Sequence, residues 1–314
     1  MIATRGFFSL FKRIRLIFLL ALFFSLPLHA ADAPRVVVSI APVHSLVSGV
    51  MSGVAVPELL VKGTVSPHSY MLKPSQMATL QRADLIVWNG ESVESFLPRT
   101  LRTLDGKRRV IKLTELHGMT LLSARAGGVW GEEEAGDHHG HHHGDVDGHL
   151  WLDPENAKVI VGAVTKMLSE IDTSHATQYR LNSAALLQQL DQLARELDVA
   201  LAPVRGVPYL VFHDGYHYFE ARFHLNAMGA ISVDPEHKPG AKRLSQLTTM
   251  VKQSQVRCVF SEPQYPSTVV QSITAGSGVK SGTLDPLGSN LETGPDLYFG
   301  LMRGLGANLK NCLQ

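Results

Sequence analysis

The stretch SHATQYRLNSAALLQQLDQLARELDVAL, residues 174–201, decides how this chain is organised. Its apolar residues recur at roughly helical spacing from Tyr179 to Leu201, and neither proline nor glycine occurs before Pro203. A single helix of about 28 residues would be about 42 Å long, which exceeds the usual globular helix. The stretch therefore predicts one rigid helix that connects two domains. The alternative is a pair of helices with an unmarked bend.

On the N-terminal side of this helix, short apolar strands alternate with helices. Strands are predicted at 35–40, 58–61 and 83–88, and helices at 43–51, 74–82 and 154–171. Asp153 is a suitable N-cap for the last of these helices, and Pro154 suits its first position. Alternation of this kind indicates a parallel sheet covered by helices.

The same alternation restarts after the long helix. Strands are predicted at 208–212 and 256–260, and helices at 243–253 and 269–275. We therefore predict an α/β protein with two lobes, each a parallel sheet flanked by helices, joined by one long rigid helix. The predicted boundaries are 34–172 for the N-terminal lobe, 173–202 for the connecting helix and 203–314 for the C-terminal lobe.

The N-terminus has the layout of a secretory signal peptide over residues 1–30. Basic residues precede a compact apolar run at 16–26, and small residues follow at Ala30 and Ala31. The run is too short to span a bilayer comfortably, which takes about 20 residues. We expect cleavage after Ala30 and a periplasmic location; the alternative is a retained N-terminal anchor.

Export also affects the charge and the cysteines. The chain has 29 basic and 28 acidic residues, and loss of the four basic residues of the leader leaves 25 against 28. A weakly acidic chain has no electrostatic footprint for nucleic acid. In an oxidising compartment Cys258 and Cys312 are expected to form a disulfide, worth roughly 4 kcal/mol; two buried free thiols are the alternative.

The segment 124–148 combines acidic residues with a run of histidines and has little apolar content. Such a composition predicts a mobile loop. Imidazoles are strong zinc ligands and carboxylates can complete a shell, so we expect weak, multiple metal binding here; a merely solvated loop is the alternative. Its histidines are His138, His139, His141, His142 and His143.

Three isolated histidines are better candidates for a structured zinc site. His68 lies in a loop after a strand, His149 lies just before a helix, and His213 ends a buried strand. Open α/β sheets bind ligands at such strand ends, although each histidine alone is more typical of a surface or capping position. Zinc prefers four ligands, and the fourth candidates are Asp285 and water.

These residues carry a resemblance to a known family. Over essentially the whole mature chain, the sequence resembles the metal-binding receptors of ABC importers for zinc and manganese, most closely the zinc-specific, ZnuA-like branch. The motifs are Pro67-His68-Ser69-Tyr70, Ala83-Asp84-Leu85-Ile86-Val87-Trp88, His149-Leu150-Trp151-Leu152-Asp153-Pro154, Phe212-His213-Asp214, Leu284-Asp285-Pro286-Leu287-Gly288 and the His-rich insertion.

The resemblance implies a metal site in the cleft between the lobes, with His68, His149 and His213 on the ligand positions. It also implies the disulfide and a membrane permease as partner. We also expect the receptor to be a monomer. Histidine at 213, where manganese receptors tend to have a carboxylate, favours zinc. Pro67 is a departure, because some zinc receptors have an acidic residue there, and it leaves the fourth ligand open between Asp285 and water.

The function expected from these observations is an extracytoplasmic receptor that delivers Zn²⁺ to an ABC-type importer, and not an enzyme. A periplasmic zinc buffer or chaperone is one alternative. A secreted zinc hydrolase is another, since His213 and His217 have the spacing of a zincin helix. That motif needs glutamate at the second position, where Asp214 stands, and Gly215 disfavours a helix.

Overall fold

The computed structural model describes residues 33–104, 106, 108–125, 130, 146–232, 235, 239–253 and 255–314. The predicted signal peptide and the histidines at 138–143 lie outside these residues, so both remain predictions. In the part of the chain that is described, no helix is long and apolar enough to cross a membrane.

The N-terminal lobe contains a four-stranded parallel sheet in the order β2-β1-β3-β4. Strands β1 and β3 are fully buried in its centre, which explains their continuous apolar sequences. The strands are β1 (Val36–Val38), β2 (Glu58–Leu59), β3 (Leu85–Trp88) and β4 (Arg109–Lys112). The helices of this lobe are α2 (Ala41–Val50), α3 (Pro74–Arg82), α4 (Leu97–Thr103) and α5 (Pro154–Ile171), with short 3₁₀ turns η2 (Leu113–Glu115) and η3 (Leu150–Leu152).

The C-terminal lobe repeats this architecture with a parallel sheet in the order β6-β5-β7-β8. Its strands are β5 (Pro208–His213), β6 (Asn226–Ser232), β7 (Cys258–Ser261) and β8 (Lys280–Thr283). Its helices are α7 (His217–Phe223), α8 (Ala241–Lys252), α9 (Thr268–Thr274) and α10 (Leu297–Leu313). The prediction of two α/β lobes with parallel sheets is therefore confirmed.

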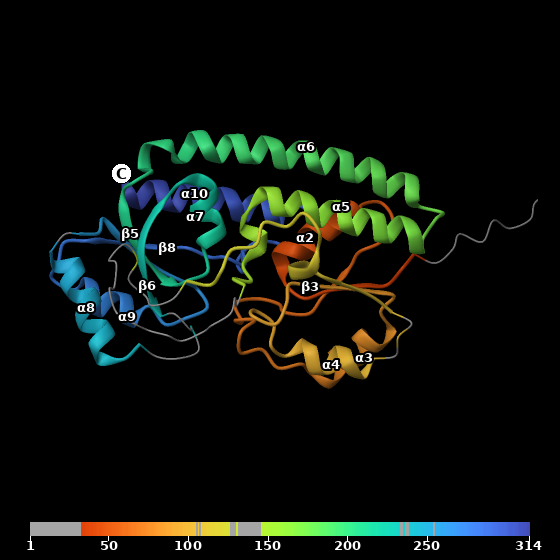
Figure 1. The fold of residues 1–314 in the computed structure, drawn as a ribbon, viewed down its shortest axis with the longest axis horizontal. Helices are drawn as coiled ribbons and strands as arrows, with labels where there is room; N and C mark the ends of the chain where they lie inside the picture. The colour runs from red at the N-terminus through yellow and green to blue at the C-terminus, as the bar shows by residue number, and fades with distance from the viewer. Residues whose placement is uncertain are drawn as a thin grey trace, which may run out of the picture. The chain divides into compact units, whose positions relative to one another are not determined.

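One long helix, α6 (Ala176–Leu201), runs along both lobes, followed by the short turn η4 (Ala202–Val204). It has 26 residues and no break, so the prediction of a single connecting helix is confirmed. In Figure 1, α5 and α10 lie beneath it, one under each half of its length. Its buried face is the leucine stripe that includes Leu186, Leu190, Leu193 and Leu197.

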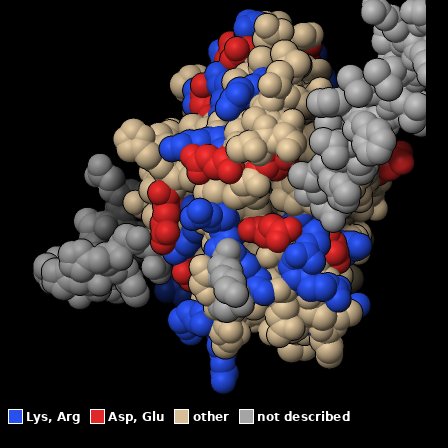
Figure 2. Space-filling view, turned by 90° about the vertical axis from the view of Figure 1, so that its right-hand side faces the viewer, with Lys and Arg blue, Asp and Glu red and all other residues tan. Residues whose placement is uncertain are grey.

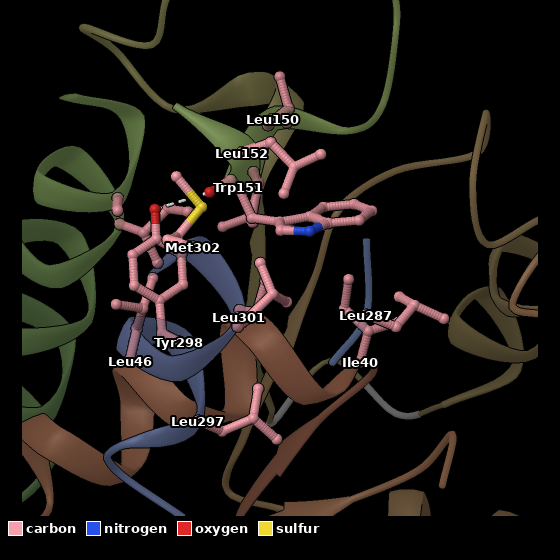
Figure 3. Packing of buried hydrophobic residues seen from close by; sticks show 14 of the residues in the cluster. Ile40, Leu46, Leu150, Trp151, Leu152, Leu287, Leu297, Tyr298, Leu301 and Met302 are labelled. Atoms are coloured by element: carbon pink, nitrogen blue, oxygen red, sulfur yellow. Dashed lines mark hydrogen bonds between the residues drawn. The ribbon is translucent and has the colours of Figure 1, made fainter. Parts of the chain in front are cut away.

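Helix α10 returns from the C-terminal lobe to pack against α2 as well as α6. Ser45 in α2 donates a hydrogen bond to the carbonyl oxygen of Pro295, and its hydroxyl accepts one from the backbone N–H of Tyr298. Figure 3 shows Tyr298 and Met302 of this helix packed beside Trp151 and Leu46. A continuous hydrophobic core therefore extends through both lobes.

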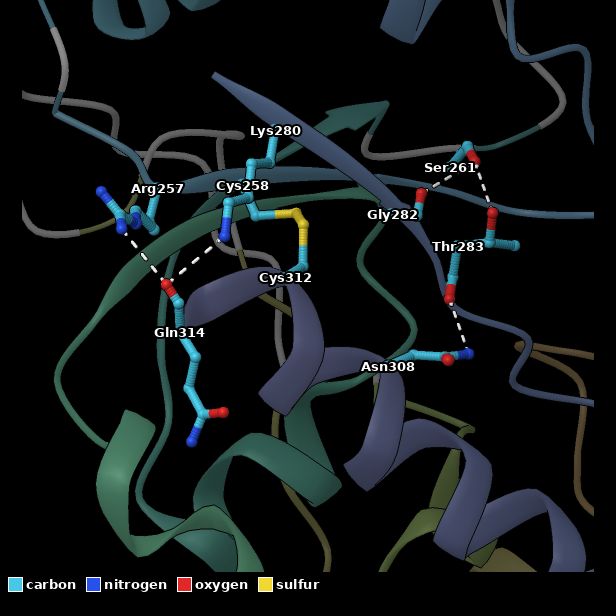
Figure 4. Close-up of a disulfide and its surroundings, with 9 residues drawn as sticks. All are labelled: Arg257, Cys258, Ser261, Lys280, Gly282, Thr283, Asn308, Cys312 and Gln314. Carbon is cyan, nitrogen blue, oxygen red and sulfur yellow. Dashed lines mark hydrogen bonds between the residues drawn. A yellow bond between two sulfur atoms is a disulfide. The ribbon is translucent and has the colours of Figure 1, made fainter. Parts of the chain in front are cut away.

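A disulfide joins β7 to α10 within the C-terminal lobe. Cys258 and Cys312 are bonded with a Cα–Cα distance of 6.0 Å, as Figure 4 shows, and the predicted disulfide is confirmed. Beside it, the carbonyl oxygen of Gln314 accepts hydrogen bonds from Arg257 and Lys280. The C-terminal end of the chain is thus fixed to the sheet.

The surface carries charges of both signs. Figure 2 shows lysine and arginine side chains interspersed with aspartates and glutamates over one face of the molecule. Among the described residues, Lys112 forms ion pairs with both Glu91 and Glu115.

Candidate metal centre

The three isolated histidines meet at one point of the fold. His68 lies in the loop between β2 and α3, His149 precedes η3, and His213 is the last residue of β5. One ring nitrogen from each lies within 4.8 Å of the others. Both lobes therefore contribute to the cluster, at the loop-bearing ends of their strands, where parallel sheets bind ligands.

The spacing of the rings suits a single small ion. The ring centroids are 5.1 to 5.8 Å apart, and the Nε2 atoms of His149 and His213 are 3.2 Å apart. Two nitrogens bound to one tetrahedral zinc would be roughly 3.3 Å apart, given Zn–N bonds of about 2.0–2.1 Å. His149 and His213 are buried and His68 is half-buried. The cavity between them is about 10 Å³, room for one water-sized species.

Two buried carboxylates orient the two buried rings. His149 Nδ1 lies 2.7 Å from Asp147 Oδ1, and His213 Nδ1 lies 2.6 Å from Glu262 Oε1. Because a carboxylate accepts hydrogen bonds, the proton of each ring belongs on Nδ1, and Nε2 presents its lone pair to the cavity. This is the carboxylate–histidine arrangement that accompanies metal-bound histidines.

Sequence reasoning missed both carboxylates. Asp147 belongs to the polar segment 124–148, but it stands two residues before His149, and its Oδ1 also accepts the backbone N–H of His149 at 3.0 Å. Glu262 follows β7, which pairs with β5 in parallel, so the topology places it beside His213. The Asp-Gly-His sequence at 147–149 could have indicated Asp147. The sequence alone contains no signal for Glu262.

The pKa values of His68 and His213 are shifted in opposite directions because their neighbours differ. Burial, reinforced by the His149 and His213 rings, holds the pKa of His68 well below its usual value. Burial also disfavours the charged form of His213, but the charge and hydrogen bond of Glu262 outweigh it and raise the pKa of that imidazole. His68 therefore remains neutral, with a lone pair available, well into the acidic range.

Gly215 allows the chain to pass close to the cluster. A Cβ atom at this position would lie 2.5 Å from His213 Nε2 and 3.2 Å from His149 Nε2. The first distance is shorter than any ordinary van der Waals contact, so any other residue would displace His213. The backbone N–H of Gly215 donates to the carbonyl oxygen of His213 at 2.9 Å, which closes the turn.

The structure does not bring Asp285 into this cluster. Its carboxylate accepts hydrogen bonds from Gln264 Nε2, from the backbone N–H groups of Leu287 and Ser289, and from the Ser289 hydroxyl, at 2.7 to 3.0 Å. Within the described ranges, the one metal-sized group of histidines, cysteines and carboxylates consists of His68, His149 and His213. His217 begins α7, and its Nδ1 is 3.9 Å from Asp147.

The beginning of the His-rich segment is attached to the C-terminal lobe. Arg125 forms ion pairs with Asp214 and Glu220, and its guanidinium lies 3.4 Å from the centre of the Trp130 ring. The backbone N–H of Trp130 donates to Met228 in β6 at 2.8 Å. Residues 125 and 130 are thus fixed next to the turn that follows His213.

Known proteins are similar to this chain in sequence and in fold. The family model for the zinc-uptake complex component A, periplasmic, matches residues 36–312. The chain belongs to this family. Its relatives in the family include the high-affinity zinc uptake system protein ZnuA of Brucella suis, which is 41% identical over 314 residues, covering 91% of this chain and 93% of that protein. The ZnuA of Yersinia pestis is 35% identical, covering 94% and 95%.

Solved structures of the family agree with the fold. A crystal structure of ZnuA superimposes with a TM-score of 0.76 at 26% identity, covering 90% of this chain and 100% of that one. A deletion mutant of ZnuA with zinc bound gives a TM-score of 0.74 at 26% identity, covering 90% and 99%. The periplasmic zinc binding protein TroA of Treponema pallidum, at 21% identity, 89% and 99% coverage and a TM-score of 0.73, shows the shared fold alone.

Proposed function

We propose that this chain is the periplasmic receptor that captures Zn²⁺ with His68, His149 and His213 and delivers it to an ABC-type membrane importer. The observation that carries this proposal is the geometry of the three imidazoles, whose ligand atoms lie within 4.8 Å of one another. In His149 and His213, Nδ1 is hydrogen-bonded to a carboxylate, so these rings need no rearrangement before the ion binds. Neutral imidazole suits zinc, whereas a carboxylate-rich site would suit manganese.

The fourth ligand is proposed to be water. Asp285 already accepts four hydrogen bonds, and turning its carboxylate toward the histidines would leave the donors of Gln264 and Ser289 unpaired. Pro67 lines the cavity but has no side-chain donor atom. A water ligand also suits a receptor, because it can be replaced by a ligand of the next protein when the ion is handed on.

A hydrolytic role is not supported by the geometry. Strand β5 ends at His213 and helix α7 begins at His217, so the two histidines do not share a helix. Asp214, which would take the place of the general base, is held in an ion pair with Arg125. A zinc buffer would use the same capture site, and co-purification of a membrane permease with the zinc-loaded receptor distinguishes the two roles.

The capture site is tested by calorimetric zinc titration of protein that lacks residues 131–145. This deletion removes the clustered histidines but keeps Asp147, which bonds to His149, and Arg125 and Trp130, which contact each other. We expect one tight site, which is lost when His68, His149 and His213 are all replaced by alanine. His117→Ala, at an exposed position, is the matched control and should bind normally.

Tight binding that survives in the triple variant would mean that other residues hold the ion.

The role of the segment 131–145 is tested separately, by zinc uptake at low and high external zinc. We propose that its histidines raise the local zinc concentration or sense abundance. Identical uptake with and without the segment at every zinc level would contradict that role.

A further inference from the structure

Gln264 connects Asp285 to the cavity of the three histidines. It follows β7 by three residues and lines this cavity together with His68, His149 and His213. Its side-chain Nε2 donates to Asp285 Oδ1 at 2.8 Å and to Ser289 Oγ at 2.9 Å. Both N–H bonds of the amide are therefore used by Asp285 and Ser289.

The hydrogen-bond network determines which way this amide faces. The Asp285 carboxylate can only accept, and Ser289 Oγ gives its own proton to Asp285 Oδ2 at 2.7 Å. Toward Gln264, both groups are acceptors, so the amide nitrogen must face them. A flipped amide would place its oxygen against two oxygens that have no proton to give.

The amide oxygen of Gln264 consequently has no hydrogen bond to Asp285 or Ser289. Gln264 Oε1 is buried and has no hydrogen-bond donor among the residues that the structure describes. Buried carbonyl oxygens are nearly always paired with a donor, from protein or water, because an unpaired one loses its hydration without compensation. Gln264 lines the same cavity as the three histidines.

We propose that Gln264 Oε1 accepts a hydrogen bond from the water molecule that is the fourth ligand of the captured Zn²⁺. This inference rests on the proposed function. A zinc-bound water is polarised by the ion and is a strong donor, so it needs an acceptor near the site. A neutral amide oxygen supplies one without competing strongly for zinc, which prefers imidazole nitrogen and thiolate sulfur.

Asp285 then acts through Gln264. Its carboxylate, with Ser289, fixes the amide orientation, and the amide in turn holds the water. Asp285 is thus a positioning residue for the fourth ligand, where the sequence pattern alone made it a candidate ligand. The water position remains exchangeable because no charged group holds it.

The direct test is a crystal structure of the zinc-loaded receptor lacking residues 131–145. We expect a zinc with three imidazole ligands and one water, with that water 2.6–3.0 Å from Gln264 Oε1, the usual range for such hydrogen bonds. A fourth ligand supplied by Asp285, or by Oε1 itself, would overturn the inference and leave the three-histidine capture site intact. No zinc at the three histidines would overturn the proposed function.

A pair of variants tests the energetic consequence. Gln264→Met keeps the length of the side chain but removes the acceptor, and Gln271→Met makes the same change at an exposed position of α9. In chelator competition, Gln264→Met should bind one zinc about 10- to 100-fold more weakly and release it faster, whereas Gln271→Met should match the parent protein. Equal affinity and equal release rate for Gln264→Met, with the stoichiometry unchanged, would refute the inference.

Discussion

Gly215 lies close to the Nε2 atoms of His213 and His149. The hydrogen atoms of this glycine leave space for the imidazole of His213, and a methyl group would occupy that space at 2.5 Å from Nε2. His213 cannot retreat easily, because Glu262 holds its opposite nitrogen and the ring is buried. The glycine is thus required by the site, in addition to shaping the turn.

We therefore predict that Gly215→Ala lowers zinc affinity at least tenfold while the protein still folds. The new Cβ should push the His213 ring out of line with His68 and His149, since a misplaced ligand loses its share of coordination. Calorimetry measures the affinity, and circular dichroism checks the fold. Gly162→Ala, where a Cβ meets nothing within 4 Å, is the control. An unchanged affinity in Gly215→Ala would show that the cavity adapts.

At this scale, sequence reasoning located the histidines but not their supports. His68, His149 and His213 are recognisable because each stands beside a strand end or a helix start. Glu262 has no such signal, because its relation to His213 depends on the pairing of β5 with β7. Asp147 belongs to the polar segment 124–148, whose composition is typical of a solvent-exposed loop.

Among the elements, the disulfide determines how firmly α10 is attached to the C-terminal sheet. The bond spans 54 residues, from the start of β7 to the end of α10. In the chain-entropy model a loop of this length stabilises the folded state by about 4 kcal/mol. We predict that Cys258→Ala/Cys312→Ala lowers the free energy of unfolding by about this amount. Urea unfolding with a zinc chelator present measures it, and a double variant as stable as the parent would contradict the estimate.

Glu94 is a buried carboxyl group just before α4. Burial raises its pKa to about 7, from an ordinary 4.5. The folded state therefore holds its proton more tightly than the unfolded chain, so its contribution to stability is complete below pH 4.5 and is lost as pH rises through 7. The shift corresponds to a decrease on the order of 3 kcal/mol in the free energy of unfolding as the pH rises.

Glu94→Gln should remove this part of the pH dependence, because the amide does not titrate. Thermal or urea unfolding of zinc-free protein between pH 4.5 and 8 should show a smaller decline in stability for the variant than for the parent. Glu292→Gln, at an exposed position, should keep the parent's profile. Parallel profiles for Glu94→Gln and the parent would mean that Glu94 titrates normally.

Two elements that the sequence did not predict, β8 and α10, have different physical explanations. Strand β8 is an edge strand of four residues with little burial, so it has no apolar pattern. Helix α10 contains Gly300, Gly304 and Gly306, which lower helix propensity in any local estimate. A Cβ at Gly306 would lie 2.7 Å from Leu197 Cδ2, so this glycine permits close packing against α6. This glycine is required by packing between two helices, which a local sequence pattern does not reveal.

In the whole molecule, the two lobes are joined by more than the predicted helix. The alternation of strands and helices predicted two sheets and their connector, but not that α10 crosses back to the N-terminal lobe. Tyr298 donates its hydroxyl proton to the carbonyl oxygen of Trp151, and Trp151 Nε1 donates to that of Pro286. These buried bonds link the two sides close to His149, where a hinge between the lobes would need to open.

We therefore predict that zinc binding moves the lobes very little. Spin labels at Thr103→Cys in α4 and Lys252→Cys in α8, both exposed, report the distance between the lobes. The zinc-free and zinc-loaded distance distributions should have maxima within about 2 Å, the displacement above which a change on binding counts as a rearrangement. Tyr298→Phe removes the bond to Trp151 and should broaden the zinc-free distribution. A large shift of the maximum on adding zinc to the parent would instead mean that α6, α10 and the shared core bend as a hinge.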